Sequence, residues 1–395
     1  MEIAMVYLDH NATTPLAPEA WAAMSAAYQS GLGNASSIHR AGQAAKAALE
    51  DARASVAELV GARPAEMVFT SGGTEADNLA LQGLAMLHPG GHIVTSQVEH
   101  HAVLHTCQDL ERRGWAVTYV PVDAAGRVEP EAVRQALRPE TFLVSIMLAN
   151  NETGVVQPVA AIAAIARQAG AKMHTDAVQA AGKREINVRE LGCDLLSVSA
   201  HKIGGPQGAG ALYVRRGTRL HPLLFGGHHE RDRRAGTENV AAMAGFGAAA
   251  RSAQAGLAAE IQRLARLRDA FEGQTQAAIP DTFVAGAGAE RVPNTSDICF
   301  RYAEGEALVI ALDLAGFCVS TGAACSSGAL EPSHVLTAMG LAPGDARSCL
   351  RFSLGRGTTA EDMAALSAAL PGVVARLRSI SPACNPSHLP APSYA

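Results

Sequence analysis

Three polar clusters along the chain combine residue types that are capable of chemistry. The first is the segment GGTE at residues 72–75, which follows the apolar run MVFTS and opens a helical stretch. Gly73 lets the backbone approach a ligand closely, and the first N–H groups of a helix can bind a phosphate together with the Thr74 hydroxyl. A glycine-threonine turn is by itself more often a helix cap, so this cluster needs support from the others.

The second and third clusters each follow an apolar run that reads as a strand. Asp176 ends KMHTDA, and Gln179 lies three residues further on. The carboxylate could pair with a protonated ring nitrogen and Gln179 could donate to a neighbouring oxygen, although a helix-capping aspartate is the alternative. Ser199, His201 and Lys202 follow DLLSV. A lysine at a strand end is a candidate Schiff-base former, although a surface lysine is the ordinary case.

The order of the three clusters indicates more than any of them alone. A phosphate-binding helix start, a strand-end carboxylate and a lysine on neighbouring strands are the groups that pyridoxal 5'-phosphate (PLP) requires. The sequence therefore predicts a PLP site. In it, Asp176 keeps the ring nitrogen protonated and Lys202 carries the cofactor.

Two further side chains could act on a bound amino acid. His100 or its neighbour His101 could stack on the cofactor and move protons near neutral pH, and chemistry alone does not choose between them. Cys325 lies in STGAACSSG among small residues and glycines, a composition suited to a mobile loop. With a PLP site nearby it is a candidate nucleophile, and a bystander thiol is the alternative.

Arg351 is a candidate for binding a carboxylate. It alternates with apolar residues in LRFSL, as on a half-buried strand. A buried arginine is costly unless it is paired, and a substrate carboxylate would be a fitting bidentate partner. An internal salt bridge is the competing account. Asn11 and Asn151 are further polar candidates near predicted turns.

Alternating strands and helices must position these groups. Short apolar runs separated by helical stretches predict an α/β fold with a mostly parallel seven-stranded sheet covered on both faces. Ligands of such sheets bind at the carboxyl ends of the strands, where the three clusters fall. The predicted strands cover residues 67–71, 92–96, 116–122, 141–148, 172–177, 194–200 and 210–215, and the helices between them cover 74–87, 100–113, 129–137 and 158–169.

The length of 395 residues favours one large and one smaller domain. A long alanine-rich helical stretch runs from about residue 240 to 277, and the remainder reads as α+β. We expect a large PLP-binding domain at 14–255 and a small domain formed by 1–13 and 256–380. The Pro/Ser-rich tail at 381–395 shows no periodicity and is assigned no secondary structure.

Composition narrows the partners and the compartment. A formal charge of −5 with 17% charged residues gives no sign of nucleic-acid binding. We find no apolar run near the ~20 residues of a membrane span and no signal-peptide pattern, so a cytoplasmic location is expected. The seven cysteines are odd in number and scattered, which argues against a disulfide framework and a zinc site. Outside Cys325 and the tail, buried inert thiols are expected at Cys107, Cys193, Cys299, Cys318 and Cys349.

Nearly the whole chain resembles the cysteine desulfurases of iron–sulfur cluster assembly, which are fold-type I, class V aminotransferase-like PLP enzymes. The loop around Cys325 and the segment VVARLRSISP are most similar to the nitrogenase-associated branch. The motifs that carry the resemblance are YLDHNATTPL, GNASSIHRAG, FTSGGTEADNLAL, VEHHAVL, ANNETGVVQPV, HTDAVQAAGK, SAHKIGGPQG, GGHHERDRRAGTENV, VPNTSDICF, STGAACSSGALEPSHVL and RFSLGRGTT.

The resemblance implies a cofactor site. Lys202 would hold PLP, His100 would stack on its ring, and Asp176 and Gln179 would bind the pyridine nitrogen and the ring hydroxyl. The phosphate would be held by three residues of the same subunit and by one from the other subunit of a homodimer. These are Thr74, Ser199 and His201, and Thr237 of the other subunit.

The resemblance also implies the reaction. L-cysteine would lose its sulfur to Cys325, leaving alanine and a persulfide that is delivered to an iron–sulfur scaffold protein. Asn151 and Arg351 would receive the substrate carboxylate. A selenocysteine lyase, another class V enzyme, or a sulfur-carrier protein without turnover are the alternatives, and the intact Lys202, Asp176 and His100 count against the last.

Several positions depart from the common pattern of the family. Gly73 stands where alanine or cysteine is frequent, Asp232 where glycine is common, and Gln207 where lysine is common. STGAACSSG also replaces the usual SSGSACTSG. None of these changes removes a reacting group, so they leave the chemistry expected from the resemblance intact.

Overall fold

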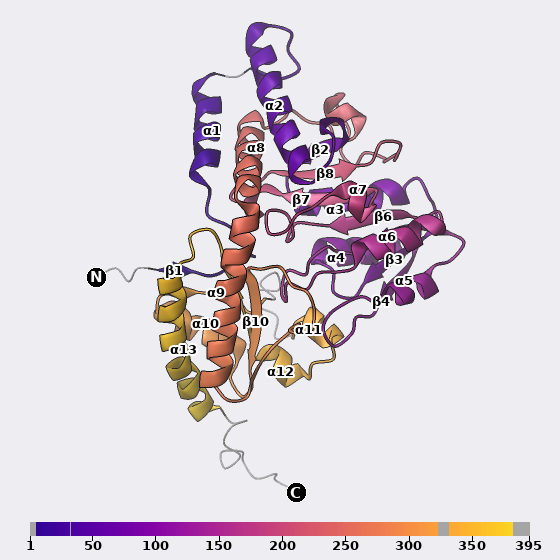
Figure 1. Cartoon of the computed structure of the whole chain (residues 1–395). Coiled ribbons are helices and arrows are strands. Elements are labelled where there is room, and N and C mark those ends of the chain that lie inside the picture. Colours follow the sequence, from indigo (N-terminus) through magenta and orange to yellow (C-terminus); the bar gives the residue numbers. More distant parts are fainter. Residues whose placement is uncertain (1–4, 32, 323–331, 382–395) are drawn as a thin grey trace, which may run out of the picture.

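The computed structural model of the protein describes residues 5–31, 33–322 and 332–381, so Cys325 and the tail after residue 381 lie outside the described residues. Within them, the larger part of the molecule is built on a seven-stranded sheet in the order β2-β8-β7-β6-β5-β3-β4 (Figure 1). The strands are β2 (Met67–Thr70), β3 (His92–Ser96), β4 (Ala116–Val120), β5 (Thr141–Ser145), β6 (Lys172–Asp176), β7 (Leu195–Ser199) and β8 (Gly210–Val214).

The mostly parallel sheet predicted from the sequence is confirmed. Strands β3 to β7 pair in parallel, whereas β8 runs antiparallel to both β2 and β7. Each of the seven expected apolar runs forms one of these strands, and the structure ends most of them one to three residues earlier. The polar clusters therefore lie where parallel strands end.

Alternate side chains of the sheet enter two separate cores. Ile93, Leu143 and Leu195 pack against helices on one face, while Val94 and Val144 face the helices on the other. This is the period of two that a strand imposes, and burial on both faces explains the continuous apolar runs. The first face carries α3 (Gly73–Ala85) and α4 (His101–Arg112), and the second carries chiefly α2 (Arg40–Leu59), α6 (Val159–Gln168) and α8 (Val240–Ala255).

Shorter elements complete this part of the molecule. Helix α1 packs against α8, and α5 packs against α6. Gly61 has a φ of +67°, a conformation that glycine adopts readily, and the chain leaves α2 there. The remaining elements are α1 (Pro18–Gln29), α5 (Pro130–Ala136), α7 (Val188–Leu191) and the 3₁₀ turns η1 (Pro64–Glu66), η2 (Ala200–Lys202) and η3 (His229–Asp232).

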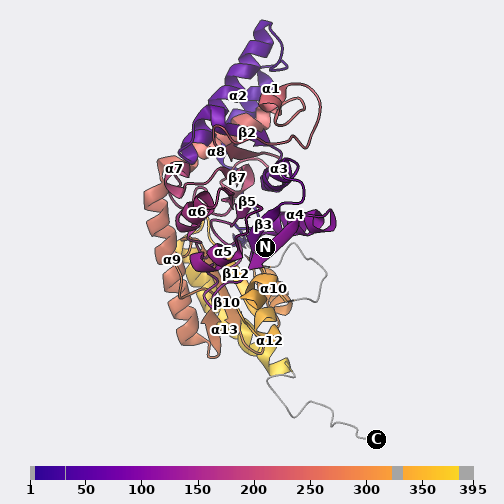
Figure 2. The same ribbon diagram turned by 90° about the vertical axis from the view of Figure 1, so that its right-hand side faces the viewer.

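The smaller part surrounds a three-stranded antiparallel sheet in the order β12-β10-β9. Helices α9, α10 and α13 pack against this sheet to form its core, and Leu8 from the N-terminal segment packs with them. Figure 2 shows this part at the opposite end of an elongated molecule from α1 and α2. Its elements are α9 (Leu257–Ala278), β9 (Thr282–Val284), β10 (Thr295–Phe300), α10 (Gly305–Leu314), β11 (Phe317–Cys318), α11 (His334–Ala338), α12 (Pro343–Arg347), β12 (Cys349–Ser353) and α13 (Ala360–Ile380).

The N-terminal segment joins the smaller part. Strand β1 (Val6–Tyr7) pairs in parallel with β11, and Asp9 bridges to Ser353 of β12. This pairing agrees with the grouping of residues 1–13 with the C-terminal domain, although the exact domain boundaries stay a prediction.

The alanine-rich helical stretch at 240–277 forms two helices, α8 and α9, which meet at Gly256. Two sequence-based expectations were wrong. The sequence showed no apolar run near the length of a membrane span, but by length and composition alone α13 is apolar enough to cross a membrane. Leu366, Leu370 and Val374 of this helix are nevertheless buried in the core of the smaller part. Cys299 and Cys349 are not free thiols, because they form a disulfide between β10 and β12.

The disulfide escaped detection because its cysteines are 50 residues apart in the sequence. Only the antiparallel register of β10 and β12 places them opposite each other. Cys107 and Cys193 are buried as expected, while Cys318 is half-buried.

Candidate active site

The carboxyl ends of β2, β3, β5, β6 and β7 surround a cavity of about 280 Å³. Such a cavity at strand ends is where an α/β sheet binds its ligands. The cavity brings together most of the candidate residues from distant parts of the chain. Its lining includes Gly73, Thr74, Asp77, His100, Asn151, Asp176, Gln179, Ser199, His201 and Lys202.

One end of the cavity is suited to a phosphate. Gly73, Thr74, Ser199 and His201 also line an adjoining hollow of about 330 Å³ at the start of α3. The Ser199 hydroxyl is buried and has no hydrogen-bond partner among the described residues. A Cβ atom at Gly73 would lie 2.7 Å from the Val178 side chain, so a larger residue here would require Val178 to shift. An unpaired Ser199 hydroxyl beside the first N–H groups of α3 is suited to binding an anion.

Asp176 lies at the centre of the cavity with a largely buried carboxylate. One oxygen accepts the Val178 N–H at 2.8 Å, which is the local turn expected of a strand-end aspartate. Burial, followed by the nearby Asp77 carboxylate, raises the pKa of Asp176 to about 7. A cationic ring nitrogen placed against Asp176 would reverse this shift, so the site fits a protonated pyridine.

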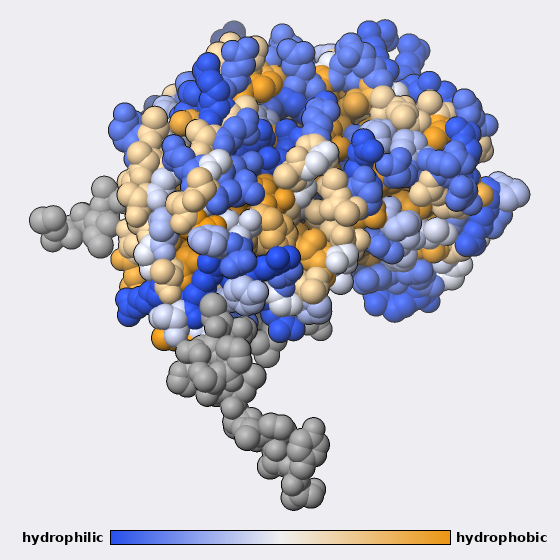
Figure 3. All heavy atoms as spheres, turned by 60° about the horizontal axis from the view of Figure 1, so that its bottom comes forward, coloured by the Kyte–Doolittle hydropathy of each residue, from blue (hydrophilic) through white to orange (hydrophobic). Residues whose placement is uncertain are grey.

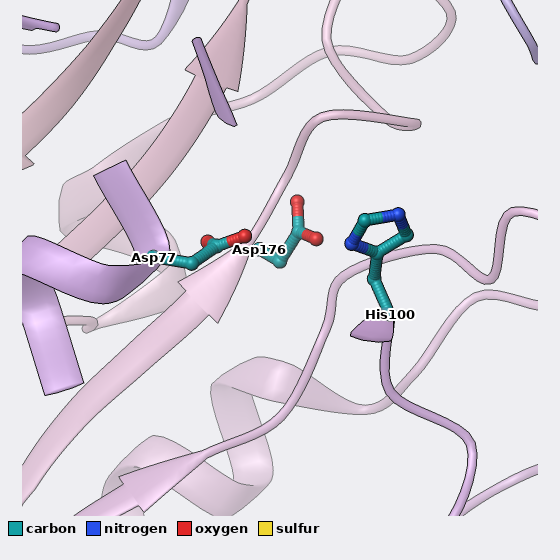
Figure 4. A group of neighbouring side chains, drawn as sticks. All are labelled: Asp77, His100 and Asp176. Atoms are coloured by element: carbon teal, nitrogen blue, oxygen red, sulfur yellow. The ribbon is translucent and has the colours of Figure 1, made fainter. Parts of the chain in front are cut away.

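Asp77 and His100 flank Asp176 on opposite sides (Figure 4). One ligand atom from each of the three lies within 4.8 Å of the others. Burial raises the pKa of Asp77 to about 7, and its Oδ1 lies 3.5 Å from His174 Nε2. Three such groups could hold a metal ion, but the cavity around them also has the phosphate end and the lysine that PLP needs.

Lys202 enters the cavity from the turn that follows β7. Its Nζ donates to the main-chain oxygens of Asn11 and Ala12, the latter at 2.7 Å. The N-terminal segment of the smaller part therefore holds the amine at the wall of the cavity. Lys202 is within the same cavity as Asp176 and Ser199, which is the arrangement the sequence predicted.

The structure separates the two adjacent histidines. His100 lines the cavity and precedes α4, where its Nδ1 accepts the Ala102 N–H at 3.1 Å. Burial, followed by Lys202, lowers the pKa of His100 to about 4, so its ring is neutral near pH 7. His101 instead stacks on His105 and packs beside His334, with ring centroids 4.8 Å apart in both pairs.

Arg351 lies just outside the cavity lining and is almost fully buried. Its Nη2 donates to Asp9 Oδ1 at 2.7 Å and its Nη1 donates to the Asn151 main-chain oxygen at 3.0 Å. The internal salt bridge that competed with substrate binding is thus present. The guanidinium still has capacity, because Nε has no hydrogen-bond partner among the residues described.

Asn11 occupies a different place from the one expected of a substrate-binding side chain. Its amide group donates to Asn151 O and to Thr295 Oγ1. Its Oδ1 accepts from Lys183 and Asn294. Because these contacts use the whole amide, Asn11 orders its neighbours and leaves no free group for a ligand.

Two expected site residues cannot be placed in this cavity. Thr237 is exposed and does not belong to the lining. Cys325 lies outside the described residues, together with the rest of residues 323–331. Their roles remain predictions.

Sequence reasoning overlooked three residues beside the candidate site. Asp77 is one helical turn after Thr74, Lys183 is four residues after Gln179, and Asp9 pairs with Arg351. Helical spacing would have placed Asp77 on the face of Thr74. The Asp9 pair joins residues at opposite ends of the chain, so no local signal indicated it.

Comparison with known proteins is consistent with this geometry. Residues 6–366 match the family described as aminotransferase class-V. "Cysteine desulfurase IscS" from Dictyoglomus turgidum is 48% identical over 379 residues, covering 95% of this chain and 96% of that protein. "Cysteine desulfurase" from Cereibacter sphaeroides is 49% identical over 380 residues, covering 95% and 97% respectively.

Solved structures agree with the sequence matches. One described as a NifS-like protein superposes with a TM-score of 0.89 at 34% identity, covering 94% of this chain and 100% of that one. Another, "SspA in complex with cysteine", gives a TM-score of 0.76 at 34% identity, covering 88% and 98%.

Proposed function

The chain belongs to the aminotransferase class-V family, and from that premise we propose that it is a PLP-dependent cysteine desulfurase. The observation that carries the proposal is the single cavity shared by Lys202, Asp176, His100 and Ser199. A carrier protein that had lost turnover would have no need of all four groups around one cavity. The reaction converts L-cysteine to L-alanine and transfers its sulfur to an enzyme thiol.

The cofactor supplies an electron sink that allows the α-carbon of a bound amino acid to lose its proton. Lys202 anchors the cofactor covalently, and Asp176 holds the ring nitrogen. Ser199, His201 and Thr74 hold the phosphate at the start of α3. The unpartnered Ser199 hydroxyl and the raised pKa of Asp176 support this orientation. The hydroxyl would donate to the phosphate, and the Asp176 carboxylate would pair with the protonated ring nitrogen.

Lys202 and His100 are placed to act on the bound amino acid. The Lys202 amine lies within the cavity, where it would take the α-proton. His100 is neutral near pH 7, because its pKa is lowered to about 4. Since Nδ1 accepts the Ala102 N–H, Nε2 carries the ring proton and can donate a hydrogen bond to the substrate. Its position against Asp176 also suits stacking on the ring.

Arg351 orients the substrate through its carboxylate, with help from Asn151. The guanidinium retains Nε and the second N–H of Nη2 as a side-on fork, while Asp9 and the Asn151 main-chain oxygen fix the rest of the group. The Asn151 side-chain oxygen is also buried without a partner among the described residues, and Asn151 lines the cavity.

Cys325 accepts the sulfur. Its thiolate attacks the substrate sulfur, the bond between that sulfur and Cβ breaks, and a sulfur–sulfur bond forms. The substrate carbon takes up a proton and leaves as alanine, so Cys325 finishes as a persulfide. The assignment rests on the resemblance of STGAACSSG to the family's cysteine loop.

The enzyme acts as a homodimer in which Thr237 completes the phosphate site of the other subunit. Thr237 is exposed, and so are the nearby Leu224 and Phe225, with Phe225 76% exposed. The Ala235 N–H donates to Leu224 O, so this apolar pair and Thr237 belong to one folded segment. Exposed aromatic groups of this kind favour burial at a subunit interface.

An iron–sulfur scaffold protein is the sulfur acceptor in this proposal, and the enzyme works in the cytoplasm. Similarity to the nitrogenase-associated branch extends the proposal to clusters for nitrogen fixation. One face of the molecule, shown in Figure 3, carries hydrophobic residues in small groups between larger hydrophilic areas. An acceptor would receive the sulfur from Cys325.

An absorption spectrum before and after L-cysteine tests the activity. The purified protein with PLP should show a visible cofactor band that changes on addition of L-cysteine, with alanine formed in the same tube. A band without alanine would indicate a different amino-acid substrate. No band after PLP addition would refute the proposed cofactor site.

A further inference from the structure

Lys183 is a buried lysine that the proposed mechanism does not use. It follows β6 by one short turn and is 7% exposed. Among the described residues it forms no ion pair with a carboxylate, although a buried ammonium normally requires one. Its Nζ instead donates to two amide oxygens, Gln179 Oε1 at 2.7 Å and Asn11 Oδ1 at 3.1 Å.

Main-chain carbonyls determine which way both amides point. Gln179 Nε2 donates to Asn11 O at 2.9 Å, and Asn11 Nδ2 donates to Asn151 O at 3.2 Å. A carbonyl oxygen can only accept, so each amide nitrogen must face its carbonyl. The two amide oxygens are consequently directed at Lys183, whose donors satisfy both in either protonation state.

The second N–H of Gln179 remains available. Gln179 lines the cavity, while Lys183 is not part of that lining. Lys183 therefore supports Gln179 from behind, and Gln179 presents a donor to the ligand. Without Lys183, the Gln179 oxygen would be buried without a partner, and the amide would keep only one of the two contacts that hold it in place.

The same lysine lies in a strongly basic environment. Burial, followed by Lys202 and Arg351, moves the pKa of Lys183 well below its ordinary value. Lys183 in turn contributes to lowering the pKa of His10 and of His201, each to about 4. Any charge that Lys183 carries therefore acts on several groups near the cofactor.

We propose that Lys183 is a positioning residue that fixes the Gln179 amide with an N–H directed at the ring oxygen of the cofactor. The inference rests on the proposed PLP site and deepens it. Donation to the ring oxygen stabilises its anionic form. Loss of the Gln179 donor therefore raises the pH at which the bound cofactor loses the proton next to its ring oxygen.

The test is a pH titration of the cofactor's visible band in the full-length enzyme loaded with PLP. Lys183→Met should raise the midpoint by about one pH unit, and Gln179→Leu should raise it by a similar amount. The double variant should show no more than the larger single shift, because the two residues act in series. Thermal unfolding of each cofactor-free variant measures any structural effect separately.

Three results would overturn the proposal. An unchanged midpoint with lower thermal stability would make Lys183 purely structural. Additive shifts in the double variant would mean that the Lys183 charge acts directly on the cofactor and not through Gln179. A Lys183→Arg variant that keeps the donors yet shifts the midpoint as far as Lys183→Met would also contradict it.

The proposal stays testable if Lys183→Met does not fold. Lys183→Gln has a shorter side chain that still ends in a polar group. Its titration midpoint is measured alone and in combination with Gln179→Leu. A wild-type protein with no visible band would contradict the cofactor site itself. That failure is distinguishable from the failure of Lys183 to move an existing band.

Discussion

The Arg351 guanidinium donates to Asp9 at 2.7 Å and ties β12 to the N-terminal segment. The exposed fraction of the Arg351 side chain is only 3%, while that of Asp9 is 20%. A buried arginine held by one carboxylate is fixed in orientation yet keeps donors for a second carboxylate. The internal salt bridge and substrate binding are therefore compatible roles of one side chain.

Replacing Arg351 by lysine separates these two roles. The ammonium group of a lysine cannot form a bidentate fork, and one charge-assisted hydrogen bond contributes about 1.5–3 kcal/mol. We expect Arg351→Lys to raise the KM for L-cysteine about 10- to 100-fold, measured by alanine formation. Asp9→Asn is the matched control, because it removes the internal partner's charge and should not raise KM. An equal rise in both variants would restrict Arg351 to the salt bridge.

Mixed dimers test whether Thr237 acts across a subunit interface. Lys202→Ala removes the cofactor lysine, and Thr237→Asp repels the phosphate, so each homodimer should be inactive. A heterodimer of the two variants would contain one intact site, formed by Lys202 of one subunit and Thr237 of the other. Activity should return to roughly half per dimer after the variants are co-expressed. Inactive heterodimers would place Thr237 in its own subunit's site.

Asp297 should make the stability of the cofactor-free protein depend on pH. It is buried on β10 opposite Arg351, and neither carboxylate oxygen has a hydrogen-bond partner among the described residues. Burial, followed by the nearby Glu152 carboxylate, raises its pKa from 3.8 to about 8. The folded state thus holds a proton that the unfolded state releases, so stability falls as pH rises between these values.

Asp297→Asn should remove that fall. Relative to wild type, the variant should gain a few kcal/mol of unfolding free energy at about pH 8 and little at about pH 4, measured by urea denaturation. Asp313→Asn, at an exposed carboxylate, is the control and should leave the pH profile unchanged. A constant difference at all pH values would contradict the titration of Asp297.

Asp77 should control the pH dependence of PLP binding through Asp176. The Asp77 carboxylate contributes to the raised pKa of Asp176, which is about 7, so PLP with a protonated ring nitrogen binds more weakly below that pH. Asp77→Asn removes one negative charge and should move the loss of affinity to lower pH. Titrating the cofactor-free protein with PLP between about pH 5 and 9 measures this. An unmoved profile would exclude Asp77 from the control of Asp176.

The sequence was sufficient where the signal is local. Continuous apolar runs, in which residues such as Ile93 and Val94 face opposite cores, mark strands buried on both faces, and Asp176 and Ser199 stand where such strands end. Parallel pairing then brings those ends to one edge of the sheet. Most of the polar cavity residues could therefore be anticipated before any contact was known, although Asp77 was not.

Contacts between residues far apart in the chain could not be predicted from the sequence. The Cys299–Cys349 disulfide, the Asp9–Arg351 ion pair and the contacts of Asn11 depend on how the N-terminal segment and β12 meet in space. The break at Gly256 gives no local signal, because alanine-rich periodicity continues on both sides of it. Such features follow from tertiary register and leave no periodic pattern.

Mass spectrometry of Cys325 after a single turnover tests the central claim most directly. Wild-type enzyme with PLP and L-cysteine, but without an acceptor, should gain one sulfur atom on the peptide containing Cys325 and release an equal amount of alanine. Cys325→Ser should keep the visible cofactor band yet form neither product at a comparable rate. Undiminished alanine formation by Cys325→Ser, or the extra sulfur on a different cysteine, would contradict the account.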